Sequence, residues 1–196
     1  MSNTNADFIN NTAGTSLYVD GYPRQPGRVI EYLSNPCDGS SVTVGSGTYT
    51  TENVTTVQVG STTYVPLTGS FISYCPPPGT KTVIYRFNYS SYWQDAHAIA
   101  HMKFYIDGYE VFYARHNRSG YYMEYRNTFE WPIVCNAAAT DYNYGRLSSW
   151  TTPRNLYMYW RDYGTSDDMN LHGTYYWDGT SGTQFSQPQL SIIALA

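Results

Sequence analysis

One Asp-Gly pair, Asp107-Gly108, constrains this chain more than any other feature, because it separates two runs of alternating side chains. Apolar residues occupy every second position of the run 102–106 before the pair, and the run 110–114 after it alternates again. Asp and Gly tolerate the positive φ angles of the tight turns that join antiparallel strands. The stretch therefore predicts a β-hairpin with strands over 102–106 and 110–114.

Period-two alternation recurs along most of the chain from Arg28 onward. It is clearest in residues 83–89, 121–131 and 156–160, whereas the run 189–196 has apolar residues in both registers, as in a strand covered on both faces. No segment carries a 3.6-residue apolar stripe longer than about two turns. Roughly nine to eleven strands with irregular loops predict an all-β fold, an antiparallel β-sandwich built as a single jelly roll.

The first 27 residues differ in composition from the rest. Residues 1–27 are rich in Asn, Thr and Gly, do not alternate, and end in Pro26-Gly27. Such a segment favours an extended arm or linker. We therefore expect an extended N-terminal arm over 1–27 and a jelly-roll β-sandwich domain over 28–196. The arm is either disordered or ordered by lying on a partner.

The balance of aromatic and charged residues points to assembly. Aromatic residues make up 17% of the chain, with 22 tyrosines, and charged residues only 13%, against about 25% in typical domains. Permanent interfaces are enriched in Tyr, Trp, Met and Arg and depleted in Lys and Glu. This balance favours an obligate homo-oligomer, although Tyr is also simply a good strand residue.

Charge and hydropathy exclude several partners. The formal net charge is −4 and no basic run occurs, which argues against duplex nucleic acid. No segment approaches the roughly 20 apolar residues of a membrane span, and the polar start lacks the regions of a signal peptide. We therefore expect intracellular synthesis, in the cytoplasm, with reduced thiols. The three scattered cysteines are interpreted as structural; they are Cys37, Cys75 and Cys135.

Two histidines raise the question of a metal site. His97 and His101 are four residues apart, a spacing that places both on one face of a helix, as in zinc enzymes. In a strand leading into residues 102–106 they lie about 13 Å apart, too far to share one ion at the 2.0–2.1 Å bonds of zinc. The strand interpretation therefore predicts no metal. A helical turn at this point, or a symmetric ion site in a trimer, is kept in reserve.

The carboxylates give no catalytic signature. Glu110, Glu124 and Glu130 fall on the outward register of the predicted strands. Facing arginines, they are more simply cross-strand ion pairs than a glycosidase pair. The acidic residues Asp162, Asp167 and Asp168 miss the EF-hand spacing and favour an ordinary acidic loop over a calcium site. The sequence therefore predicts no enzyme and no cofactor.

Aromatic clusters exceed what one core needs. Exposed Tyr and Trp stack on sugars, whereas the same residues between subunits form an interface. The low charge favours the interface. If the chain instead binds carbohydrate, the expected stacking residues are Trp93, Tyr121, Tyr122 and Trp177.

A series of short motifs between Arg28 and Gly108 carries a resemblance to a known class. The motifs are Arg28-Val-Ile-Glu-Tyr-Leu, Pro36-Cys-Asp-Gly-Ser, Ser46-Gly-Thr-Tyr-Thr, Gly69-Ser-Phe-Ile-Ser-Tyr, Pro77-Pro-Gly-Thr-Lys-Thr-Val-Ile-Tyr-Arg-Phe and Asp95-Ala-His-Ala-Ile-Ala-His-Met-Lys-Phe-Tyr-Ile-Asp-Gly. Over residues 28–135 the chain resembles structural proteins of large marine and algal viruses and of some aquatic phages. The resemblance implies a trimeric jelly roll like those of tumour necrosis factor or complement, and no catalytic role for the histidine segment.

Together these observations predict a viral structural protein. It would be an oligomeric, trimeric jelly-roll subunit located in the virion as a minor capsid, cement, spike or fibre component. Its arm over 1–27 would contact other capsid proteins. The alternative is a carbohydrate-binding or receptor-binding lectin with a host surface glycan as its partner, and a weaker rival is a metal-dependent or carboxylate hydrolase.

Overall fold

The chain folds almost entirely into β-strands. The computed structural model describes residues 18–19, 22–23, 26–93, 98–121, 124–165 and 169–196. Within these ranges every pair of neighbouring strands is antiparallel. Helical structure there amounts to two short 3₁₀ turns, and no helix is long and apolar enough to cross a bilayer. The all-β, antiparallel expectation is confirmed.

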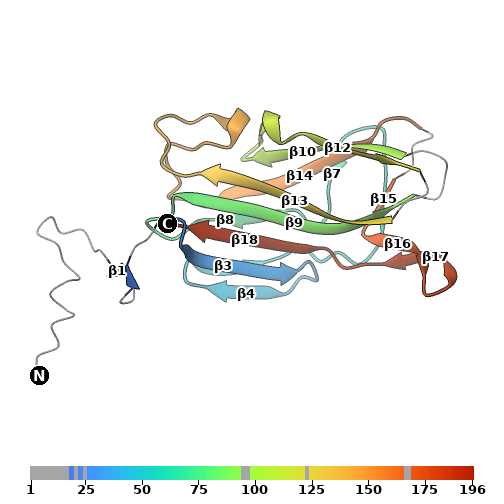
Figure 1. Ribbon diagram of the computed structural model, residues 1–196, viewed down its shortest axis with the longest axis horizontal. Helices are drawn as coiled ribbons and strands as arrows, with labels where there is room; N and C mark the ends of the chain where they lie inside the picture. The colour runs from blue at the N-terminus through green and yellow to red at the C-terminus, as the bar shows by residue number, and fades with distance from the viewer. Residues whose placement is uncertain (1–17, 20–21, 24–25, 94–97, 122–123, 166–168) are drawn as a thin grey trace, which may run out of the picture.

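Two six-stranded sheets form the body of the molecule (Figure 1). The β9 sheet contains β3 (Val29–Pro36), β18 (Gln189–Leu195), β9 (Thr82–Tyr92), β13 (Glu124–Val134), β15 (Asn170–Leu171) and β6 (Gln58–Val59). The β10 sheet contains β11 (Tyr109–Glu110), β12 (His116–Gly120), β10 (Ala98–Ile106), β14 (Arg154–Asp162), β7 (Val65–Pro66) and β8 (Ile72–Tyr74). Three hairpins complete the fold: β1 (Tyr18–Val19) with β2 (Tyr22–Pro23), β4 (Ser41–Val44) with β5 (Gly47–Thr50), and β16 (Gly173–Trp177) with β17 (Thr180–Phe185).

Eight strands pair in a nested order. Taken in chain order they are β3, β8, β9, β10, β12, β13, β14 and β18. The first pairs with the last, the second with the seventh, the third with the sixth, and the fourth with the fifth. Two sideways pairings, β18 with β9 and β14 with β10, then join these pairs into the two sheets.

The inward faces of both sheets share one core. Phe104 of β10 lies between two rings of the β9 sheet, with ring centroids 4.8 Å from Tyr85 and 5.4 Å from Phe129. Tyr89 donates its hydroxyl to the sulfur of Met102 across the same gap. All five side chains are buried or nearly so, because the alternation of β9, β10 and β13 turns these positions inward. Two sheets packed in this way form a sandwich-like body.

The Asp107-Gly108 turn is confirmed, but the strand after it is shorter than predicted. Asp107 and Gly108 have φ angles of 50° and 87°, as a two-residue hairpin turn requires. Strand β11 ends after Glu110, and the chain then forms the 3₁₀ turn η2 (Phe112–Ala114), so the predicted strand over 110–114 is wrong. The backbone N–H of Ala114 donates to Val111 O, which turns the chain away and lets β12 take over the pairing with β10.

The start of the domain is tied to its end. Gly27 N donates to Ala196 O at 2.8 Å, and Ala196 N donates to Arg28 O at 2.8 Å. The hairpin β1–β2 precedes this point and, among described residues, pairs only with itself. Residues 1–17, 20–21 and 24–25 of the predicted arm lie outside the described residues, so the extended arm over 1–27 stays a prediction.

Candidate functional site

Apolar side chains cross the outward face of the β9 sheet around Ile193 and Leu195 of β18. Figure 1 shows the C-terminus at this end of the sheet. One row contains Tyr32, Ile193, Ile84 and Pro132, which are in register on four adjacent strands. The next row contains Val29, Leu195 and Val134 around Thr82. We call the seven apolar side chains of these two rows the apolar band. Tyr32 and Val29 are 55% and 51% exposed, so the single chain leaves much of the band in solvent.

The position of β18 explains the band. This strand lies between β3 and β9, and its alternation sends Leu190, Ile192 and Ala194 into the core. Ile193 and Leu195 therefore point outward and stay partly exposed. The sequence of β18 predicts cover on both faces, but the residues that the structure describes cover only the inner one.

Beside the band, the same face becomes polar and its groups bind each other. Arg86 Nε donates to Glu130 Oε2 at 2.7 Å, across strands β9 and β13. Thr128 donates to the side-chain oxygen of Asn88 at 2.7 Å in the next row. These positions are satisfied within the chain, so the apolar band is the part of this face that is best suited to a contact outside it.

The outward face of the β10 sheet is aromatic. Tyr105 and Tyr157 are stacked with ring centroids 5.5 Å apart and an interplanar angle of 8°. Tyr159 lies 5.4 Å from Tyr105, and Phe71 extends the series with a centroid 6.3 Å from Tyr157. Tyr105, Tyr157 and Tyr159 are on the register opposite to the core, as the alternation of β10 and β14 requires.

Cations gather around one tyrosine next to these rings. The amine of Lys103 lies 4.4 Å from the centroid of the Tyr64 ring, and the guanidinium of Arg161 lies 5.4 Å from it. Lys103 Nζ is 3.0 Å from Glu110, and Arg115 also pairs with this carboxylate. The hydrogen bond from Arg115, assisted by Lys103, lowers the pKa of Glu110. We call this group, together with His101, the Tyr64 cluster.

Three of the four predicted sugar-stacking residues are described. Trp93 is only 2% exposed and its ring lies 5.8 Å from that of Tyr125, so it belongs to the core and is corrected as a surface candidate. Tyr121 and Trp177 are 55% and 65% exposed and stay candidates. Tyr122 lies outside the described residues.

The histidine pair is only half described. His97 lies outside the described residues, so its distance from His101 is not tested. His101 is on β10, opposite Arg161, and its ring is 5.9 Å from the ring of Tyr163. The described part of the chain contains no cluster of three or more His, Cys, Asp or Glu side chains arranged to hold a metal ion.

The thiols and carboxylates have structural surroundings. All three cysteines are free, and burial raises the pKa of Cys37 to about 12 and that of Cys135 to about 11. Glu130 pairs with Arg86, and Glu124 accepts the backbone N–H of Tyr175 at 2.5 Å. Burial disfavours the thiolate forms of Cys37 and Cys135, and Glu124 and Glu130 bind different partners. Of the predicted acidic loop, Asp167 and Asp168 lie outside the described residues.

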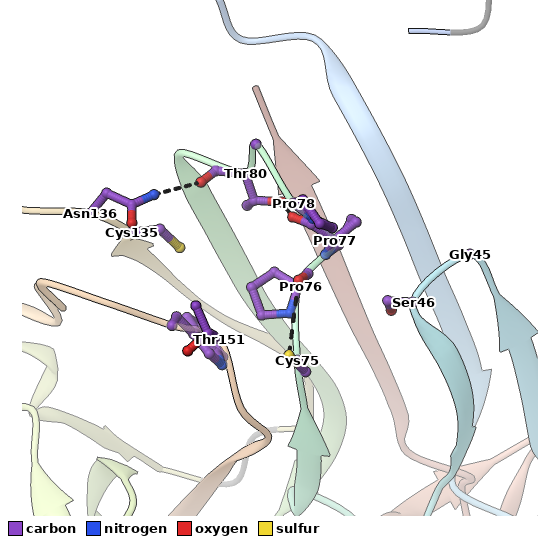
Figure 2. A pocket seen from close by; sticks show the side chains of 12 residues that line it. Gly45, Ser46, Cys75, Pro76, Pro77, Pro78, Thr80, Cys135, Asn136 and Thr151 are labelled. Atoms are coloured by element: carbon purple, nitrogen blue, oxygen red, sulfur yellow. Dashed lines mark hydrogen bonds between the residues drawn. The ribbon is translucent and has the colours of Figure 1, made fainter.

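A hollow of about 580 Å³ opens at the corner between β8 and β9. Figure 2 shows Pro76, Pro77 and Pro78 along it, with Ser46 on one side and Asn136 on the other. Its described lining contains no carboxylate, histidine or lysine. The titratable groups in this lining are the thiols of Cys75 and Cys135, and burial raises the pKa of both, which does not suit acid–base catalysis near neutral pH.

No family model matches the sequence, and no curated protein matches it either. The sites therefore have to be interpreted from their own chemistry. Sequence reasoning did not single out the Tyr64 cluster. The signal was present in part, since Lys103 and Arg161 fall on the outward register of their strands, but Tyr64 lies in a loop before β7.

Proposed function

We propose that this chain is a structural subunit of a virus particle, a trimeric jelly roll used as a minor capsid, cement, spike or fibre component. The nested pairing of eight strands supports the jelly-roll part of the proposal, because a jelly roll is a long hairpin of strands rolled into two sheets. The resemblance over residues 28–135 supports the viral part.

The apolar band is the observation that carries the assembly. Burying apolar surface contributes roughly 25 cal/mol per Å², and the band presents seven apolar side chains on adjacent strands. Homo-oligomer interfaces are more apolar than the rest of the surface and depleted in charge at their centre. A second and third copy packed on the band would complete the cover on β18 that its sequence predicts.

The same end of the molecule suits attachment to a shell. Gly27 is hydrogen-bonded to Ala196, so the chain before it leaves the domain next to the band. We propose that the arm over 1–27 contacts neighbouring capsid proteins from this end. The subunit would then be held both by its copies and by the shell.

The assembly is tested by the molar mass of the purified chain at low micromolar concentration, measured by light scattering and native mass spectrometry. Ile193→Glu places a charge at the centre of the band and is expected to yield monomers. Val59→Glu is the matched control, because Val59 is 67% exposed on β6, outside the band. A wild-type monomer, or a trimer that survives Ile193→Glu, would contradict the assembly.

The location is tested separately. Antibody to the chain should label purified particles of the virus that encodes it, and peptide mass spectrometry of those particles should detect the chain in a multiple of three copies. If the particles lack the chain, the virion assignment fails even when the trimer is found.

Exposed aromatic residues favour a second candidate, a carbohydrate-binding or receptor-binding module. Trp177 and Tyr176 are 65% and 59% exposed on the β16–β17 hairpin, where their rings suit stacking on a sugar. In this case a glycan array would give reproducible hits that Trp177→Ala removes. An array without hits would argue against this candidate.

A further inference from the structure

We propose that the Tyr64 cluster is a binding site for an acidic saccharide, a sugar that carries a carboxylate or a sulfate. The site lies on the outward face of the β10 sheet, whereas the apolar band lies on the β9 sheet. It also differs from the Trp177 hairpin. The inference is thus independent of the assembly and concerns an additional activity of the subunit.

The charge of the cluster does not balance within the chain. Lys103 and Arg115 share the single carboxylate of Glu110. Arg161 has no ion-pair partner in the part of the chain that the structure describes, and its Nη1 reaches only the carbonyl of Thr62, at 3.3 Å. Three cations against one carboxylate leave an excess of two positive charges, in a chain whose formal net charge is −4. An anionic ligand would complete this local balance.

Two buried nitrogen atoms of the cluster also lack hydrogen-bond partners among the described residues. His101 Nε2 and Arg161 Nε are buried atoms that bind no other group within the described residues. Unpaired buried polar atoms are uncommon and cost free energy, so each one indicates a missing partner. His101 and Asn117 line a hollow of about 250 Å³ together with Tyr64 and Arg115. A carboxylate or sulfate placed there would accept hydrogen bonds from the lining side chains of His101, Asn117 and Arg115, while Arg161, opposite His101 and 5.4 Å from the Tyr64 ring, would add positive charge beside it.

The aromatic rings select a sugar over a bare anion. Tyr64 is 37% exposed, and Tyr159 is partly exposed next to Lys103 on the neighbouring strand. Tyrosine presents an apolar face to a pyranose ring and a hydroxyl that can bind its polar groups. The hollow is smaller than the roughly 300–1,000 Å³ typical of drug-sized ligands. It therefore suits one sugar residue of a chain that continues along the aromatic face.

The test is calorimetric titration of the full chain with three saccharides. A heparin-derived tetrasaccharide carries sulfate and carboxylate, trigalacturonate carries carboxylate alone, and maltotriose is neutral. The acidic probes are expected to bind and maltotriose is not; the response to trigalacturonate decides whether a carboxylate suffices. Equal binding of maltotriose would overturn the requirement for an anionic group.

Matched arginine variants locate the site. Arg161→Gln and Arg115→Gln each remove one cation of the cluster and should weaken binding about tenfold or more, as loss of a charge-assisted hydrogen bond does. Arg115 is 45% exposed at its side chain, so Arg115→Gln should fold even if Arg161→Gln does not. Arg126→Gln is the control, because Arg126 is exposed on β13 of the other sheet.

The inference is also contradicted if neither acidic probe binds, or if Arg126→Gln loses as much affinity as the two cluster variants. The monomeric Ile193→Glu chain separates this inference from the assembly. The dissociation constant per subunit for the acidic probe should stay within about twofold in that variant. Loss of binding on dissociation would overturn the claim that one chain forms the site.

Discussion

The two sheets of this protein have similar inward faces and different outward ones. Inward, both contribute large apolar side chains to one core, such as Phe87 from the β9 sheet and Phe104 from the β10 sheet. Outward, the β9 sheet presents an apolar band, whereas the β10 sheet presents stacked tyrosines and cations. The inward side chains hold the two sheets together, so they are similar in both. The outward side chains are free of this constraint, so their chemistry differs between the sheets. The two outward faces should therefore respond differently to changes that leave the core intact.

The largest expected effect comes from the core that both faces share. Phe104→Ala removes a fully buried ring that contacts Tyr85 and Phe129 of the other sheet. The free energy of unfolding should fall by about 3–5 kcal/mol, because the change loses apolar burial and leaves a cavity. Urea titration followed by fluorescence measures this loss. Because the core is shared, Phe104→Ala should weaken both assembly and saccharide binding. Loss of only one of these two activities would show that the core does not couple the two sheets.

Acid should lower the stability of the fold by protonating a buried histidine between the two sheets. His172 is fully buried, and its Nε2 lies 3.0 Å from Oγ1 of Thr68, in the turn between β7 and β8. Burial lowers the pKa of His172 to about 4, below the roughly 6.5 of an unfolded histidine. The folded chain therefore disfavours the charged form. Stability contributed by neutral His172 is complete above about pH 6.5 and is lost as the pH falls toward 4, by up to about 3 kcal/mol.

Urea midpoints measured between pH 7 and pH 4 test this expectation. His172→Asn should flatten the decline, and Asn tolerates the φ angle of 64° at this position. Part of the slope should remain, since burial also lowers the pKa of His116. An unchanged slope in His172→Asn would show that other groups cause the acid sensitivity.

Salt should have a smaller effect, and it should act on saccharide binding but not on assembly. Raising NaCl from about 0.05 to 0.5 M should weaken binding of the acidic probe several-fold, because the Debye length shortens and screens the cations of the Tyr64 cluster. Assembly through the apolar band should change little over the same range, since apolar burial involves no charge. Calorimetry and light scattering on the same samples measure both. A trimer that dissociates with salt would contradict an apolar interface.

The smallest effect is expected in the polar row beside the band. Arg86→Gln removes the pair with Glu130, whose side chains are 36% and 43% exposed. Exposed ion pairs contribute about 0–1 kcal/mol, so the unfolding midpoint should move little and the trimer should persist. A loss as large as that of Phe104→Ala would mean that this row, rather than the band, lies at the interface.

Local features of the fold were predictable from the sequence, but the partners of each strand were not. Asp107-Gly108 indicated its hairpin turn because the required φ angles select these residue types. Alternation put Met158 and Trp160 on one face of their strand, and both side chains are fully buried. It could not show that β14 pairs with β10, since period-two patterns specify a face and leave the neighbouring strand open.

The errors and omissions at the candidate sites have the same origin. Trp93 was expected at the surface, yet it is 2% exposed within the shared core, with its ring 5.8 Å from that of Tyr125 on β13. The local sequence does not predict the partners of the buried Glu31. This carboxylate is satisfied by Ser46 and by Tyr74, which are 15 and 43 residues away. Such long-range contacts are set by the topology, and no local pattern records them.

The nested pairing has a consequence for the order of folding. The outermost pair joins β3 to β18, so the first long strand of the domain pairs with a strand far along the chain: Ser34 lies opposite Ser191, a separation of 157 residues. Pairings this distant in sequence close late and slow the search for the native state. During synthesis the edge of β3 that pairs with β18 stays unpaired until β18 leaves the ribosome. In this state unpaired strands of different copies can associate incorrectly. A chain truncated before Gln189 would keep this edge of β3 unpaired, so folding of the whole domain depends on β18.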